Sequence, residues 1–381
     1  IPETLYFLTG QVSYMKSKGL EVHALSSPGD DLGKFGRQEG IAVHAVEMPR
    51  RITPVQDLIA IRRLWRSLRA IKPQIVHAHT PKGGLLGMIS AWLARVPVRV
   101  YHVHGLPFVT ATGVKRTLLR LSERASCLLA TQVYSVSHAN RDVITAEGLC
   151  SPRKIKVLLN GSINGLDAAG RFNPERVGAD AGQGTRAQYG IPTGATVLGF
   201  VGRVVRDKGL IELAEAWQTL RADFADLHML VVGPFEPQDP VPDAVKTMLQ
   251  TDERIHLAGM VGPDEMPAYY AAMDLLVLPT YREGFPYVPM EAAAMGLPVV
   301  ASRVPGCTEA VQDGVTGTLV PARDAAALTA ALRQYLENPD LRHQHGQAGR
   351  ARMLRDYLPE ALWNAQYEEY VALLRRSRVR V

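Results

Sequence analysis

The sequence predicts an α/β protein made of two doubly wound, Rossmann-like domains that face a cleft. Short apolar segments rich in β-branched residues alternate with helical patterns, and this alternation occurs in both halves of the chain. Near-continuous apolar strands separated by helices are typical of parallel sheets covered on both faces. The length of 381 residues is too great for one ordinary core and suits two domains.

In the first half, the predicted strands are LYFLT, EVHALS, AVHAVEM, QIVHAHT, RVYHVH, QVYSVS and IKVLLN. Between them, residues 55–71 carry apolar side chains at helical spacing, and the opposite face is basic. The segment therefore predicts a helix that packs its apolar stripe on the sheet. Its basic residues are Arg62, Arg63, Arg66 and Arg69.

In the second half, the predicted strands are TVLGFVG, HMLVVG, IHLAGMV, LLVLPT, PVVAS and GTLV. A polar, glycine-rich stretch without periodicity at 160–195 predicts the joint between the domains. We expect one domain at 1–165 and a second domain at 166–359. The helical pattern at 359–376 predicts a C-terminal helix, and we expect about 360–381 to pack back on the first domain.

The composition, with 46% hydrophobic and 21% charged residues, is that of a soluble globular protein. No apolar run approaches the roughly 20 residues that span a bilayer. The three cysteines form no C-x-x-C pair, which favours a reducing, cytoplasmic compartment. Residues 1–165 hold 22 Lys and Arg against 10 Asp and Glu, a balance of +12, whereas residues 166–381 carry −6. The first half should therefore prefer an anionic partner, unless its charge is only a solvated basic face.

The stretch GFVGRVVRDKG at 199–209 predicts a strand that ends in a tight turn before a new helix. Ligands of open parallel sheets sit beyond the carboxyl ends of the strands, at helix N-termini. The cations of this turn suit a diphosphate, because Arg binds two oxygens and Lys supplies a point charge. An ordinary surface turn would have the same pattern, and the stretch is neither a Walker loop nor G-x-G-x-x-G. The cations are Arg203, Arg206 and Lys208, and Gly202 precedes them.

The stretch EGFPYVPMEAAAMG predicts a loop after a buried strand and then a helix from about Pro286 to Gly296. N–H groups in the first turn of a helix have no carbonyl partner within that helix, so we expect those of Tyr287 and Val288 to form an anion site. Glu283 and Glu291 flank that site, and each can accept hydrogen bonds from hydroxyl groups. A ligand with hydroxyls at both ends and a diphosphate between them is a nucleotide-sugar.

The two glutamates form an E-x7-E motif that resembles the donor motif of retaining glycosyltransferases of family 4, which have the GT-B fold. The resemblance extends through VPGCTEAVQDGVTGTLV, FVGRVVRDKG, PQIVHAHTPKGGLLG, VHGLPF and VLLNG, and so covers nearly the whole chain. The sequence around HTPKGGLLG and HGLPF most resembles that of the enzymes that assemble capsule, exopolysaccharide and O-antigen repeat units. The resemblance implies a hexosyl- or N-acetylhexosaminyltransferase that uses a UDP-sugar and retains the anomeric configuration without an enzymic nucleophile or a metal cofactor.

Carried over by position, the resemblance implies a role for each motif residue. Glu283 would bind the transferred sugar, and Glu291 the ribose. Arg203 and Lys208 would hold the diphosphate, and His104 would lie near the sugar. Backbone donors would come from Gly284, Phe285, Tyr287 and Val288, and Gly202 would end the phosphate-side strand. Gly10 and Gln11 would form the acceptor-side loop, although many members of the family have two glycines there.

The resemblance also implies that the domain at 1–165 is on the acceptor side and that the domain at 166–359 binds the donor. The acceptor that it implies is a lipid-diphosphate-linked sugar or a saccharide. The basic first half then predicts a peripheral position on the cytoplasmic face of an anionic membrane. Its cations are concentrated at Arg50, Arg51, Arg62, Arg63, Arg66 and Arg69, and at Lys115, Arg116, Arg120 and Arg124.

Three other interpretations remain. A nucleotide-sugar epimerase would use the same donor pocket without an acceptor. A basic nucleic-acid binder would explain the charge, but no RRM, KH or helix-turn-helix signature is present, so we expect no nucleic-acid partner. The patterns HAH and HVH could indicate a metal site, but no third ligand is spaced nearby in the sequence, so we expect strand packing for most of these histidines.

Overall fold

The computed structural model describes residues 5, 7–49, 53–237 and 239–377. The chain divides into two compact units, residues 1–165 with 359–381 and residues 166–358. Within the described residues of each unit, every pairing between two strands is parallel. The boundary falls inside the predicted joint, but much of that joint is folded and belongs to the second unit as helices α7 (Pro174–Val177) and α8 (Ala179–Gln188).

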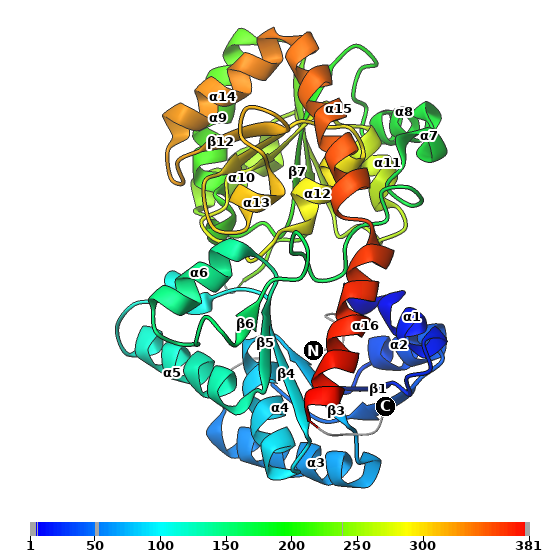
Figure 1. Ribbon diagram of the computed structural model, residues 1–381. Coiled ribbons are helices and arrows are strands. Elements are labelled where there is room, and N and C mark those ends of the chain that lie inside the picture. Colours follow the sequence, from blue (N-terminus) through cyan, green and yellow to red (C-terminus); the bar gives the residue numbers. More distant parts are fainter. Residues whose placement is uncertain (1–4, 6, 50–52, 238, 378–381) are drawn as a thin grey trace. The chain divides into compact units, whose positions relative to one another are not determined.

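The first unit contains a four-stranded sheet in the order β3-β4-β5-β6 and a separate β1-β2 pair (Figure 1). Its elements are α1 (Gln11–Ser17), β1 (His23–Ser26), α2 (Asp30–Glu39), β2 (Ala42–Ala45), α3 (Pro54–Ile71), β3 (Ile75–His79), α4 (Pro81–Leu93), β4 (Val98–Val103), η2 (Pro107–Val109), α5 (Gly113–Leu129), β5 (Gln132–Ser135), α6 (His138–Ala146), β6 (Ile155–Lys156) and α16 (Pro359–Arg376). The glycines of the PKGGLLG stretch let α4 approach the sheet. A Cβ on Gly84 would lie 2.1 Å from the ring of Tyr101, and one on Gly87 would lie 2.9 Å from Ala78.

The second unit is one six-stranded sheet in the order β12-β11-β10-β7-β8-β9. Its first strand is therefore central, and the strand order reverses between β7 and β10. In a doubly wound sheet, this switch point is where a ligand crevice opens. The elements are β7 (Thr196–Val201), η3 (Arg206–Lys208), α9 (Leu210–Asp223), β8 (Leu227–Val232), α10 (Asp243–Thr251), β9 (Ile255–Gly259), α11 (Met266–Ala271), β10 (Leu275–Leu278), α12 (Tyr287–Ala294), β11 (Val299–Ser302), α13 (Cys307–Ala310), β12 (Gly317–Val320), α14 (Ala325–Glu337) and α15 (Pro339–Asp356).

Each unit has its own core. In the second unit, Trp217, Phe200 and Tyr335 are fully buried between the sheet and its helices. In the first unit, α16 closes part of the core, since its Tyr370, Leu373 and Leu374 pack with Val98, Val100 and Tyr134 of the sheet. All three cysteines are free and buried.

The predicted strand at LYFLT is wrong. Among its described residues, Leu5, Phe7 and Leu8 lie in a 3-10 turn, and Thr9 and Gly10 form a turn that leads into α1. Gly10 has φ 79°, and a Cβ there would lie 2.7 Å from the Trp363 ring of α16. Packing against a helix more than 350 residues away therefore overrides the β-propensity of the segment.

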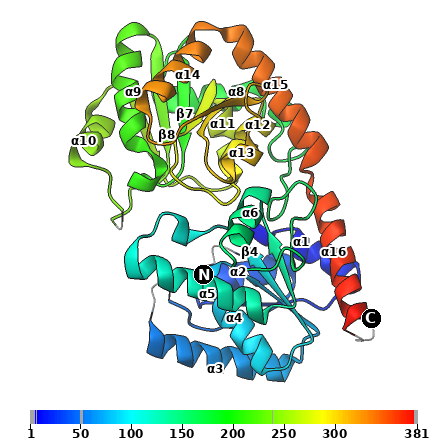
Figure 2. The same cartoon turned by 60° about the vertical axis from the view of Figure 1, so that its left-hand side comes forward.

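The helix expected at 55–71 forms as α3, but only part of its apolar stripe packs inward. Leu64 and Leu68 are buried, whereas Val55, Leu58 and Ile59 are exposed. In both views α3, α4 and α5 lie side by side, and α4 contacts both of its neighbours (Figures 1 and 2). None of the helices in the described part of the chain has both the length and the apolar character that a bilayer crossing needs.

Candidate active site

The carboxyl ends of β7 and β10 bring the two predicted donor segments together in the second unit. Strand β7 ends before Gly202, and the 3-10 turn η3 and Gly209 then lead into α9. Gly209 has φ 72°, and a Cβ there would lie 1.8 Å from the carbonyl oxygen of Pro279, just after β10. Only glycine permits this approach, because both the backbone conformation and the contact exclude a side chain.

Hydrogen bonds fix the turn η3 to the loop after β10. The Asp207 carbonyl oxygen accepts a bond from the Tyr281 N–H (2.9 Å), and the Asp207 carboxylate accepts one from Arg282 Nε (2.8 Å). The buried Thr280 hydroxyl donates to the same Asp207 carbonyl at 3.2 Å. The position of the phosphate-side turn is therefore set by the loop that carries Glu283.

Lys208 and Glu283 form the central contact of this site. Lys208 Nζ donates to Glu283 Oε1, and the two side chains are only 20% and 15% exposed. Arg203 is less enclosed, with a 52% exposed side chain, and its Nη1 lies 2.7 Å from Glu236 Oε2. Arg206 is exposed. The structure thus brings Lys208 and Glu283 together, and it pairs Arg203 with a carboxylate that the sequence did not indicate.

Helix α12 begins at Tyr287, directly after Phe285 and Pro286. Its first N–H groups have no partner within the helix, so this end is electropositive. Phe285 is buried against Tyr357, with ring centroids 5.7 Å apart. A Cβ on Gly306 would lie 2.4 Å from the Gly284 carbonyl oxygen, so the loop before α13 packs closely on this segment.

Glu291 lies on α12, about one turn beyond its start. The Tyr270 hydroxyl donates to Glu291 Oε2 at 2.7 Å. Burial raises the pKa of Glu291 above its ordinary value, while this hydrogen bond and Arg171 oppose the shift. Nothing in the sequence pointed to Tyr270.

In the first unit, Gly10 and Gln11 are at the start of α1. The Gly10 N–H donates to Glu39 Oε1 at 2.9 Å, and the buried Gln11 side chain lies 3.4 Å from Gln366 of α16. His104 follows β4, and its Nε2 lies 2.9 Å from His79 Nδ1. Burial, followed by the neighbouring histidines, holds the pKa of His104 well below its ordinary value.

His77 and His79 of β3 lie close to His102 of β4 and to His104, which follows β4. The argument against a metal site, that no third ligand is spaced nearby in the sequence, is therefore wrong. Parallel pairing sets His102 opposite His79, and ring nitrogens of His77, His79 and His102 all lie within 4.8 Å of one another. Burial lowers the pKa of His79 to about 4 and holds those of His77 and His102 well below their ordinary value. These shifts favour the neutral form of each ring. The third ligand that the sequence seemed to lack comes from the neighbouring strand.

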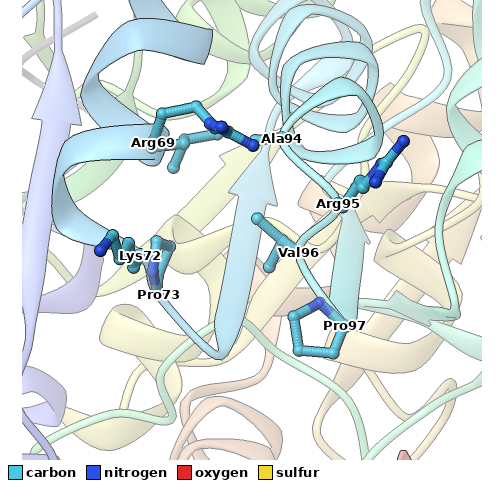
Figure 3. A pocket seen from close by; sticks show the side chains of 8 residues that line it. Arg69, Lys72, Pro73, Ala94, Arg95, Val96 and Pro97 are labelled. Carbon is cyan, nitrogen blue, oxygen red and sulfur yellow. The ribbon is translucent and has the colours of Figure 1, made fainter.

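A pocket of about 350 Å³ lies at the opposite, amino-terminal edge of the first sheet, between the ends of α3 and α4 and the starts of β3 and β4 (Figure 3). Arg69, Lys72 and Arg95 are among its lining residues, but in Figure 3 their charged groups point in different directions. Ligands of such sheets bind at the other edge, so we assign this pocket no part in the chemistry.

Two family models match the chain. Residues 195–338 match "Glycosyl transferases group 1", and residues 7–161 match "Glycosyl transferase 4-like domain". Together the two models match most of the chain and identify it as a glycosyl transferase. It is therefore an enzyme that transfers a glycosyl group, and the resemblance found in the sequence is confirmed.

Curated relatives agree with this family. The chain is 28% identical over 377 residues to the capsular polysaccharide biosynthesis glycosyltransferase CapM of Staphylococcus aureus, an alignment that covers 99% of this chain and 96% of CapM. It is also 28% identical over 291 residues to an Escherichia coli UDP-Gal:α-D-GlcNAc-diphosphoundecaprenol α-1,3-galactosyltransferase, covering 74% of this chain and 71% of that enzyme.

Solved structures share the fold. Anabaena HepE, in a complex with UDP and glucose, superposes with a TM-score of 0.76 at 20% identity, covering 96% of each chain. WaaG, a glycosyltransferase involved in lipopolysaccharide biosynthesis, has a TM-score of 0.70 at 16% identity, covering 94% of each chain. The predicted fold class, GT-B with two Rossmann-like domains, is confirmed.

Proposed function

We propose that this glycosyltransferase moves a hexosyl or N-acetylhexosaminyl group from a UDP-sugar to a lipid-diphosphate-linked or saccharide acceptor, with retention of configuration, during assembly of a bacterial surface polysaccharide. The observation that carries the proposal is the Lys208–Glu283 pair at the switch point between β7 and β10. The relatives that act in capsule synthesis and on a diphosphoundecaprenol-linked sugar support this class of donor and acceptor.

In the proposed complex, Lys208 and Arg203 bind the diphosphate of the donor. When the bond between the sugar and the diphosphate breaks, negative charge grows on the leaving UDP, and a fixed cation stabilises that charge more than it stabilises the ground state. The first-turn N–H groups of α12, those of Tyr287 and Val288, add hydrogen-bond donors that also stabilise negative charge on the diphosphate. No step of this scheme requires a metal ion, which stays our expectation.

The two glutamates bind hydroxyl groups on either side of the diphosphate. Glu283, next to Lys208, accepts a hydrogen bond from the transferred sugar. Glu291, held by Tyr270, accepts from the ribose through its other oxygen. The acceptor hydroxyl attacks the anomeric carbon on the face that the diphosphate leaves, its proton passes to the departing phosphate, and the configuration is kept. For His104, whose Nε2 lies 2.9 Å from His79 Nδ1, the role near the sugar stays a prediction from the resemblance.

We further propose that the first unit rests on an anionic membrane. On α5, exposed apolar side chains recur on one helical face at Val114, Leu118, Leu121 and Leu128, and α3 exposes Val55, Leu58 and Ile59. Exposed cations border both sets, namely Arg62, Arg63, Arg66 and Arg69 on α3 and Lys115 and Arg124 on α5. Arg116 and Arg120 instead pair with Glu147, and Arg50 and Arg51 lie outside the described residues.

An apolar stripe bordered by cations is the pattern of a helix that lies in a membrane interface. Each basic residue near an anionic surface contributes about 1 kcal/mol, and the contribution fades within roughly 8–10 Å at physiological salt. Four or five such residues give reversible attachment and also attract a diphosphate-bearing acceptor.

Co-sedimentation with vesicles tests the membrane proposal. We expect binding to vesicles that contain anionic lipid at about 0.05 M salt, less at about 0.5 M, and weaker binding for Leu118→Ser with Leu121→Ser. Met260→Ser is the matched control, because Met260 is an exposed apolar residue of the second unit. Binding that is absent at low salt, or indifferent to lipid charge, contradicts the proposal and leaves a soluble acceptor.

The transfer proposal is tested against the epimerase alternative, which the named transferase relatives do not favour. The enzyme is incubated with a UDP-sugar, with and without a sugar-diphosphate-lipid acceptor, and the products are followed by chromatography and NMR. We expect a new glycosidic bond with the anomeric configuration of the donor only when acceptor is present. Turnover of the free UDP-sugar to its epimer, without dependence on acceptor, contradicts the proposal.

A further inference from the structure

The histidine cluster of the first unit has the arrangement of a metal site. His77 and His79 lie two residues apart on β3 and so project from the same face of the sheet. His102 is paired with His79 on β4, and its ring stacks on His77 with centroids 5.3 Å apart. Ring nitrogens of the three residues approach one another within 4.8 Å.

Two of these nitrogens are unsatisfied. His77 Nε2 and His102 Nδ1 are buried, and neither has a hydrogen-bond partner among the residues that the structure describes. Leaving a buried polar atom unpaired costs about 1–3 kcal/mol, so packing alone does not explain why two such atoms lie close together. A ligand that accepts electron pairs from both would remove this cost.

In His77 and His79, the other ring nitrogen, Nδ1, already has a hydrogen-bond partner. The Tyr370 hydroxyl lies 2.5 Å from His77 Nδ1, and His104 Nε2 lies 2.9 Å from His79 Nδ1. Histidines that bind metals almost always use one nitrogen for the metal and the other for such a hydrogen bond, which fixes the tautomer and the ring orientation. Because Nδ1 of His77 and Nδ1 of His79 have these partners, Nε2 is the nitrogen that each ring leaves for an ion.

We propose that His77 Nε2, His79 Nε2 and His102 Nδ1 bind a divalent transition metal ion of the Zn²⁺, Co²⁺ or Ni²⁺ type. Three imidazoles without a carboxylate or thiolate suit these ions, whereas Mg²⁺ and Ca²⁺ require oxygen ligands. Tetrahedral Zn–N bonds of about 2.0–2.1 Å place the nitrogens about 3.3 Å apart, so separations of up to 4.8 Å have to shorten by at most about 1.5 Å. The fourth position stays open to water, and no step of glycosyl transfer uses the ion.

Titration of chelator-treated protein with Co²⁺ and Zn²⁺ tests the site. We expect one Co²⁺ per chain, with the intense visible absorption of tetrahedral coordination, displacement by Zn²⁺, and no response to Mg²⁺. Zn²⁺ should also raise the melting temperature of the wild-type chain, because an ion that binds only the folded state stabilises it. Competition with a chromogenic chelator then gives the dissociation constant.

Variants assign the ion to these residues. His77→Gln and His102→Gln should each weaken binding by more than about 100-fold, and Tyr370→Phe, which removes only the outer partner, by about 10- to 100-fold. His256→Gln is the matched control, since His256 stacks on His228 and the described residues offer this pair no third metal-binding side chain. Tyr134→Phe controls for loss of a nearby hydroxyl, because that group donates to Glu369.

Failure of the wild-type chain to bind Co²⁺ or Zn²⁺ overturns the proposal. Binding that survives His77→Gln and His102→Gln with unchanged affinity also overturns it, because the ion then lies elsewhere. If the glutamine variants do not fold, Tyr370→Phe decides, since an unchanged affinity in that variant contradicts the assigned geometry.

Discussion

Replacing Lys208 with alanine is expected to lower kcat/KM by about 10³-fold. The side chain is only 20% exposed, so an effective dielectric constant near 20 applies, and a unit charge about 4 Å away then interacts by about 4 kcal/mol. Each 1.36 kcal/mol is a factor of ten in rate, which gives about 10³-fold. Arg203 is 52% exposed and more screened, so Arg203→Ala should lose nearer to 10²-fold, the lower end for a removed charge-stabilising donor.

The assay is UDP release under initial-rate conditions, with kcat and KM measured separately. Arg333→Ala is the matched control, because Arg333 forms an exposed ion pair with Asp223 in the same unit and should stay within about twofold of wild type. The double variant Lys208→Ala with Glu283→Ala should be strongly non-additive, since the two side chains touch. Near-normal rates in both Lys208→Ala and Arg203→Ala would refute the diphosphate role.

The remaining predictions concern donor contacts, pH dependence and backbone geometry. Glu291→Ala should raise KM with little change in kcat, whereas Glu283→Ala should also lower kcat; identical kinetic signatures would exclude this division of roles. Burial raises the pKa of Glu123 to about 7. In the folded chain this carboxyl therefore keeps a proton that it releases in the unfolded chain, so the free energy of unfolding falls as pH rises from about 4.5 to about 7. Glu123→Gln removes this titration and should reduce the fall by roughly 3 kcal/mol in thermal melts. Gly209→Ala should destabilise far more than Gly190→Ala, because both have positive φ but only Gly209 would clash, and equal losses in chemical denaturation would contradict that reading.

Much of the fold could be predicted because the relevant signals are local. The apolar strands before Gly202 and Glu283 are buried on both faces, and a continuous hydrophobic run records that burial directly. The donor segments followed from the same pattern, since residues at the carboxyl ends of parallel strands meet at one edge. The direct contact between Lys208 and Glu283 joins residues 75 positions apart, and motif spacing alone gave no sign of it.

The features that the sequence missed depend on long-range packing. The turn at Gly10 is set by Trp363, and the partners Glu236 and Tyr270 meet their sites only through the tertiary fold. The histidine cluster depends on the register between two strands, which sets His102 opposite His79. A shift of one residue would move His102 to the other face of the sheet, so the HAH and HVH patterns could not establish a third ligand.

Thermal-shift titration with UDP tests the account most directly, because it examines the donor site apart from acceptor and membrane. A ligand at 100 times its dissociation constant stabilises the folded state by roughly 2.7 kcal/mol. We expect UDP to raise the melting temperature more than GDP or ADP, with the shift largely lost in Lys208→Ala and Glu291→Ala and kept in Arg333→Ala. A UDP shift that is undiminished in both Lys208→Ala and Glu291→Ala would contradict the assignment of the switch point between β7 and β10 as the donor site.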